Sequence, residues 1–190
     1  KTLAENTSDD NAYQKLLFAE DSARGFAFIE LCRQKYDVIV MNPPFGDASV
    51  NTESYLQRNY TTWGKNILAA FFERTLELID TSGLVGAIFD RTVAIKSSYE
   101  AFRIKCFCGH ITAMADTGWN VLDANVETTS LILKKGNDSK LGVFIDITEE
   151  QNKDAVLTES IKNIYKNVNS KNIFIKNSQS FNSLPNSIIG

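Results

Sequence analysis

The sequence predicts an α/β fold in which helices cover both faces of a mostly parallel sheet. Two apolar runs, at residues 38–41 and 84–89, lack the polar alternation of a strand that faces water on one side. Segments with helical periodicity, at residues 22–35 and 66–80, adjoin these runs in the chain. Strand and helix therefore alternate, as they do in the units that build parallel sheets.

The first 41 residues are expected to form a connection, a strand, a helix and a second strand. Residues 1–11 are polar and typical of a connection, whereas residues 13–19 form a short apolar run. Residues 22–35 show helical spacing, and residues 36–41 follow as a strand that is expected to be buried on both faces.

The middle of the chain is expected to begin with a long polar loop at residues 46–65. Loops of this length are usually functional, and Tyr60 and Trp63 either line a substrate-facing side or pack the loop itself. Asn66 is placed to cap the helix of residues 66–80. Further strands are predicted at residues 111–115, 128–133 and 141–147, and further helices at residues 97–107 (opened by a capping box) and 153–165.

Composition points to an ordinary globular domain. The 190 residues are 43% hydrophobic with a net charge of −3, which argues against a self-sufficient nucleic-acid binder. No signal peptide or membrane-spanning run is visible, and three cysteines without a framework spacing fit a reducing cytoplasm. A zinc site at Cys106, Cys108 and His110 would need a fourth ligand, and only Cys32 is available. Buried thiols are therefore the favoured interpretation of these cysteines.

The strand of residues 36–41 must end at Asn42, because Pro43 and Pro44 have no N–H to give a sheet. Ligands bind at this carboxyl end of the strands in open α/β sheets. The prolines stiffen the backbone, so the Asn42 side-chain oxygen and the Pro43 carbonyl form a fixed pair of acceptors. Such a pair suits a planar –NH2 group, and Phe45 offers a ring on which an aromatic base stacks.

This Asn-Pro-Pro-Phe corner resembles the catalytic motif of class I S-adenosylmethionine-dependent methyltransferases that act on adenine in DNA. Residues 65–74 with 84–88, and residues 121–133, are similar to later segments of that family. The sequences of these segments are most similar to those of the large methyltransferases of BREX phage-defence systems, followed by type IIG restriction-modification enzymes. The resemblance covers residues 12–135 and implies part of a Rossmann-like class I methyltransferase fold.

The resemblance implies S-adenosylmethionine as the cofactor. It places an acid near the cofactor's adenine at the end of the strand before the catalytic one, and Asp21, or less surely Glu20, matches that position. Asp21 is equally suited to capping the helix that follows. None of the ten glycines forms a Gly-x-Gly turn, so the first unit of the cofactor site is expected to precede Lys1.

The resemblance further implies double-stranded DNA with a flipped adenine as the substrate. Asn42, Pro43, Pro44 and Phe45 would then hold the base, because adenine's amine cannot be reached inside a duplex. Leu122 is the candidate apolar wall on the other side of the base, although a leucine that is simply buried in the loop is the more common case. Other defence-system subunits are possible partners, and no membrane is expected.

Residues 1–148 are expected to form the later part of the catalytic domain. Residues 149–190 would be an extension, with a linker or partly ordered edge at residues 167–186, leading to a target-recognition domain. The chain is accordingly expected to be a piece of a longer protein, inactive on its own. We expect a solvated helix face for the basic side chains of Arg91, Lys96 and Arg103, rather than contacts with DNA phosphates.

Two other functions remain open at this stage. The same Asn-Pro-Pro corner serves methyl transfer to glutamine amides in proteins or to bases in RNA, since an amide –NH2 makes the same two hydrogen bonds. Alternatively, the chain is a non-catalytic scaffold that binds DNA or a partner and retains only the fold.

Overall fold

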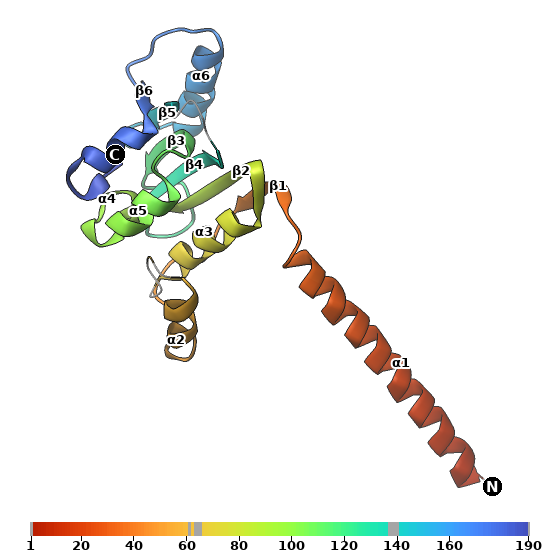
Figure 1. Ribbon diagram of the computed structural model, residues 1–190. Helices are drawn as coiled ribbons and strands as arrows, with labels where there is room; N and C mark the ends of the chain where they lie inside the picture. Colours follow the sequence, from red (N-terminus) through yellow and green to blue (C-terminus); the bar gives the residue numbers. More distant parts are fainter. Residues whose placement is uncertain (1, 61, 63–65, 137–140, 190) are drawn as a thin grey trace. The chain divides into compact units, whose positions relative to one another are not determined.

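The computed structural model describes residues 2–60, 62, 66–136 and 141–189, with side chains from residue 13 onward (Figure 1). The chain divides into two units, Lys1–Lys35 and Tyr36–Gly190. None of the helices in the part of the chain described here is long and apolar enough to cross a membrane.

A six-stranded sheet organises the second unit, in the order β1-β2-β4-β3-β5-β6. The strands are β1 (Tyr36–Met41), β2 (Ile79–Asp90), β3 (Ile111–Gly118), β4 (Thr128–Lys134), β5 (Leu141–Asp146) and β6 (Ile173–Asn177). The β1–β2 and β3–β5 pairs are parallel, and the other three pairs are antiparallel. It follows that β1, β2, β3 and β5 point the same way, and that their carboxyl ends share one edge of the sheet.

Helices cover both faces of this sheet, as predicted. The helices of this unit are α2 (Val50–Asn59), which has no buried residue, α3 (Ile67–Leu78), α4 (Thr92–Ile95), α5 (Glu100–Cys106) and α6 (Lys153–Tyr165), with 3-10 turns η1 (Ser97–Tyr99), η2 (Ser178–Ser183) and η3 (Pro185–Ser187). Met114 packs in the main core with α3 and α5, whereas its neighbour Ala115 packs with α6. Because successive side chains of a strand point to opposite faces, α6 lies on the face opposite to α3 and α5.

Four phenylalanines form the centre of the main core: Phe72, Phe89, Phe102 and Phe107. Their ring centroids lie 5.0–5.8 Å apart, mostly edge to face, which is the geometry that aromatic rings prefer. The rings come from α3, β2 and the α5 region, so they tie both helices to the strand beside β1.

The first unit is a single helix, α1 (Thr2–Leu31). The predicted strand at residues 13–19 is therefore wrong, and so is the predicted connection at residues 1–11. A short, largely apolar segment fits a strand or a helix equally well, and it becomes a strand only where it can pair with a sheet. Tyr13, Leu16 and Phe18 are all exposed on the helix.

The strand at residues 36–41 is confirmed, but its burial on both faces is not. Val38 and Val40 are 57% and 80% exposed, whereas Ile39 and Met41 pack against the main core. The strand β1 lies at the edge of the sheet, and only the face that carries Ile39 and Met41 packs against the core. An apolar run predicts a strand, but it does not reveal whether both faces are covered.

Two segments predicted as irregular contain regular structure. Within the predicted loop at residues 46–65, residues 50–59 form α2. None of its residues is buried, so the sequence has no apolar stripe that would predict a helix there. Within the predicted linker, β6 pairs with β5 at the edge of the sheet. The helix predicted to open with a capping box begins instead with η1, and no side chain caps it.

Arg103 fastens the end of the chain to the sheet unit. Its side chain is fully buried and donates to the carbonyls of Val93 (2.8 Å), Lys96 (2.7 Å), Asn186 (2.5 Å) and Ser187 (2.9 Å). Asn186 and Ser187 have positive φ angles of 55° and 50°, in the left-handed region that non-glycine residues rarely adopt. The predicted solvated position of Arg103 is therefore wrong.

Candidate active site

The candidate site begins where β1 ends. Met41 is the last β1 residue paired with β2, opposite Ala87, and the two prolines that follow have no N–H to continue the ladder. Asn42 is exposed and Pro43 is buried, while Pro44 is exposed again. Among the described residues, no hydrogen bond engages the Asn42 side chain or the Pro43 carbonyl. A pair of acceptors thus adjoins the carboxyl edge of the sheet.

Phe45 is half-buried and packs against the main core. Its ring is consequently fixed by the protein while part of it stays accessible. Gly46 follows with a φ of 113°, a conformation open to glycine but strained for other residues. The chain therefore turns sharply just after the four residues predicted to be catalytic.

Asn66 holds the far side of this turn. Its backbone pairs with Asp47, and the next amide, of Ile67, donates to the carbonyl of Gly46 at 3.3 Å. The buried Asn66 side chain accepts from the Leu68 amide at 2.8 Å, which confirms the predicted cap of α3. Its amide nitrogen also donates to the Tyr99 hydroxyl at 2.7 Å. Only the cap was predicted, because the spacing of residues does not reveal the contacts with residues 46–47 and Tyr99.

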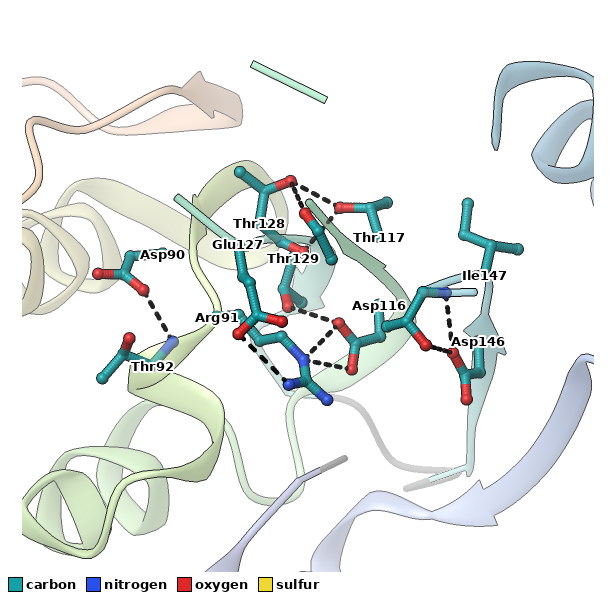
Figure 2. A network of polar contacts seen from close by, with 12 residues as sticks. Asp90, Arg91, Thr92, Asp116, Thr117, Glu127, Thr128, Thr129, Asp146 and Ile147 are labelled. Carbon is teal, nitrogen blue, oxygen red and sulfur yellow. Dashed lines mark hydrogen bonds and ion pairs between the residues drawn. The ribbon is translucent and has the colours of Figure 1, made fainter. Parts of the chain in front are cut away.

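A charged network lies at the same edge of the sheet, one strand along (Figure 2). Arg91 directly follows β2, and its Nε lies 2.8 Å from both carboxylate oxygens of Asp116 in β3. The Arg91 amide donates to the Glu127 carbonyl at 3.0 Å, and Nη1 lies 3.7 Å from Glu127 Oε2. Arg91 therefore connects the end of β2 to β3 and to the residue before β4. Its predicted solvated position is wrong, and this network was not predicted.

The pKa of Arg91 reflects this environment. Burial alone would lower the pKa of the guanidinium, but the hydrogen bond and the charge of Asp116, helped by Glu127, raise it above its ordinary value. The side chains of Arg91 and Asp116 are 24% and 12% exposed, so solvent screens the pair less than it screens a surface ion pair. Arg91 therefore stays charged throughout the physiological pH range.

Residues 119–127 connect β3 to β4 and are called here the β3–β4 loop. Two hydrogen bonds join the strands at its base, from Thr117 Oγ1 to the Thr128 carbonyl (2.7 Å) and from Thr128 Oγ1 to the Gly118 carbonyl (3.3 Å). Leu122 is half-buried within the loop. Because β3 ends at the same edge of the sheet as β1, the loop that carries Leu122 starts on the side of the sheet where Asn42 lies.

Asp21 and Glu20, the residues predicted to lie near the cofactor, are exposed within α1 rather than at the end of a strand, so the predicted strand end is wrong. Their contact with the cofactor stays a prediction. The described residues also form no group of three His, Cys, Asp or Glu side chains suited to a metal ion. Trp63, the other predicted aromatic of the site region, lies outside the described residues.

Cys106 and Cys108 are buried thiols. Burial raises the pKa of Cys106 far above its ordinary value, and it raises that of Cys108 to about 11. Both side chains are therefore protonated at neutral pH, a state that favours neither nucleophilic attack nor metal binding.

Comparison with solved structures shows that the chain has a class I methyltransferase fold. The methyltransferase subunit of a type I restriction-modification system from Streptococcus thermophilus matches with a TM-score of 0.58 and 16% identity, over 78% of this chain and 36% of that one. A Listeria monocytogenes protein assigned as a class I S-adenosylmethionine-dependent methyltransferase matches with a TM-score of 0.53 and 14% identity, over 69% of this chain and 42% of that one.

The chain belongs to the Eco57I restriction-modification methylase family, whose sequence model matches residues 1–116. Among curated proteins, the type II methyltransferase M.VspI from Vibrio sp. (strain 343) is 29% identical over 104 residues. That alignment covers 54% of this chain and 26% of M.VspI, so the chain spans about a quarter of that relative.

Proposed function

We propose that this chain carries the catalytic corner of an adenine-specific DNA methyltransferase, which transfers a methyl group from S-adenosylmethionine to adenine's exocyclic amine. The observation that carries the proposal is the Asn42–Pro43 acceptor pair, which no described residue engages, at the carboxyl edge of the sheet. Membership of a restriction-modification methylase family supports DNA as the substrate.

The chemistry rests on how the corner treats an –NH2 group. The lone pair of adenine's amine is delocalised into the ring, which makes the nitrogen a poor nucleophile. When Asn42 Oδ1 and the Pro43 carbonyl accept hydrogen bonds from its two N–H groups, the nitrogen can become tetrahedral and free its lone pair. Positive charge that develops on the nitrogen strengthens both hydrogen bonds, so the corner favours the transition state over the ground state.

Phe45 and Leu122 complete the proposed base site. The fixed Phe45 ring stacks on the base, and it adds cation–π attraction as the base becomes positive. Leu122, from the β3–β4 loop, covers the other side of the base. The base reaches the site by flipping out of the duplex, at a cost of a few kcal/mol.

S-adenosylmethionine is the proposed methyl donor, in keeping with the fold. Asp21 and Glu20 lie in α1 and no Gly-x-Gly turn occurs in the sequence, so we assign no residue of this chain to the cofactor. We assign to this chain the binding of the amine.

The proposal extends to the organisation of the whole protein. Residues 1–148 would belong to the catalytic domain, and residues 149–190 would lead toward a target-recognition domain. The protein would act in the cytoplasm on double-stranded DNA, together with other subunits of a restriction-modification or phage-defence system. The isolated chain is expected to be inactive.

The test is modified-base sequencing of genomic DNA from cells that carry the intact gene or its Asn42→Ala form. We expect N6-methyladenine within one short motif for the intact gene and none for Asn42→Ala, because one of the two acceptors is lost. Asn51→Ala, an exposed position on α2, is the matched control and should retain methylation. Full methylation by Asn42→Ala would refute the assignment of Asn42.

A further inference from the structure

The β3–β4 loop is held by hydrogen bonds at its ends and has few hydrogen bonds of its own. Its base is closed by the two threonine hydrogen bonds and by the bond between the Arg91 amide and the Glu127 carbonyl. Within the loop, the one backbone hydrogen bond recorded among the described residues joins the Val126 amide to the Ala124 carbonyl. The position of the loop therefore depends on how its ends are held.

The side of the loop away from the network is open. Trp119 and Val121 are 48% and 39% exposed, and they border a cavity of about 1010 Å³ that is otherwise lined by residues around Ile147 and the start of α6. The hydrogen bonds at the base of the loop and the ion pair of Arg91 with Asp116 belong to the network of Figure 2.

Arg91 is the centre of that network. It is the residue whose backbone binds Glu127, at the end of the loop, and its side chain clamps Asp116 in β3. Asp116 is itself fixed, because its carbonyl accepts from the Ile147 amide at 3.0 Å and its carboxylate lies 3.4 Å from Thr129 Oγ1. The guanidinium directs Nε to Asp116 and Nη1 toward Glu127 at the same time, which the single nitrogen of a lysine ammonium cannot reproduce.

Arg91 lies at the same edge of the sheet as the catalytic corner, four residues beyond Ala87, the β2 partner of Met41. It follows β2, which pairs in parallel with β1, and neighbouring strands lie about 4.8 Å apart. The end of the loop at Glu127 is thus tied to the strand next to the one that presents Asn42. A shift of Arg91 would move the loop relative to the corner.

We propose that Arg91, clamped by Asp116, is a positioning residue that fixes the β3–β4 loop so that Leu122 closes over a base held at Asn42. This inference rests on the proposed function in one respect, the identity of the base site. The holding of the loop by Arg91 can be tested without any activity.

The first experiment is hydrogen exchange of the chain, wild type against Arg91→Lys. Losing one hydrogen bond to a charged group corresponds to about a tenfold change in an opening equilibrium. We therefore expect amides of residues 119–127 to exchange about tenfold faster in Arg91→Lys, with β2 and β4 unchanged. Arg74→Lys, which alters an exposed ion pair with Glu77 on α3, is the matched control and should change nothing in the loop. Unchanged loop exchange in Arg91→Lys would overturn the inference.

The second experiment uses the intact protein and a DNA duplex with 2-aminopurine at the target base, whose fluorescence rises when the base leaves the stack. Arg91→Lys and Asp116→Asn should raise KM for DNA and lower the 2-aminopurine signal, each about tenfold, and leave KM for S-adenosylmethionine unchanged. A merely structural defect would lower the active fraction and leave both KM values unchanged. Faster loop exchange with a normal KM for DNA would overturn the role at the base. If wild type makes no methyladenine, the proposed function fails, and loop exchange alone decides whether Arg91 holds the loop.

Discussion

Replacing Arg103 with Met should unfasten the end of the chain. Arg103 is the largest fully buried side chain, and it is bound to four carbonyl oxygens rather than to a carboxylate. Burial lowers the pKa of its guanidinium, partly offset by Glu100, but an arginine remains charged in water at any ordinary pH. Met has a similar reach and fills the space while offering no donor.

The magnitude follows from the four bonds. The bonds to Val93 and Ser187 are buried, so removing their donor leaves two buried acceptors unsatisfied, at about 1–3 kcal/mol each. The bonds to Lys96 and Asn186 are only partly buried, and water can replace them. Relief from burying a charge offsets part of the loss. We expect Arg103→Met to lower the free energy of unfolding by about 2–4 kcal/mol.

The assay is urea unfolding of the chain, followed by circular dichroism. Limited proteolysis gives a second readout, because residues 186–189 should become cleavable before the sheet unfolds. Arg74→Met, on the exposed face of α3, is the control and should stay within about 0.5 kcal/mol of wild type. A similarly small change for Arg103→Met, with no new cleavage, would refute the reasoning.

Two further predictions concern the support of the site and the thiols. Asn66→Ala should lower the free energy of unfolding in urea by about 1–3 kcal/mol, because it removes the cap of α3 and the donor to Tyr99. Asn66→Asp keeps the cap and should lower it by less. Equal losses in the two variants would contradict this. Cys106 and Cys108 should react slowly with Ellman's reagent at pH 8 while Cys32 reacts quickly. Folding raises the pKa of both buried thiols. Their contribution to stability should therefore be complete below about pH 8.5 and should fall as the pH rises toward 11. An equal free energy of unfolding at pH 7 and pH 10.5 would argue against this contribution.

The sequence was sufficient where the signal is local. The apolar run of residues 38–41 and the prolines after it predict both the strand and its end, because each effect acts within a few residues. The cap at Asn66 is equally local. The family resemblance rests on these same segments, and the family is confirmed by its match to residues 1–116.

The sequence was insufficient where a residue's partners are distant. Arg103 binds a carbonyl 84 positions away, and Arg91 binds a carboxylate 25 positions away. Both were predicted to be solvated, because charge alone does not reveal a partner on another element. The elements α2 and β6 were missed because their signals are weak. The helix α2 is polar and has no buried face, and β6 is a five-residue strand within a segment dominated by Asn, Ser and Lys.

The most direct test of the central claim is nucleoside mass spectrometry after methyl transfer in vitro. The intact protein is incubated with labelled S-adenosylmethionine and duplex DNA, and wild type is compared with Asn42→Ala and Asn51→Ala. We predict label in N6-methyladenine for wild type and Asn51→Ala, and none for Asn42→Ala. Label in cytosine, in RNA or in protein glutamine instead, or undiminished methyladenine with Asn42→Ala, would contradict the account.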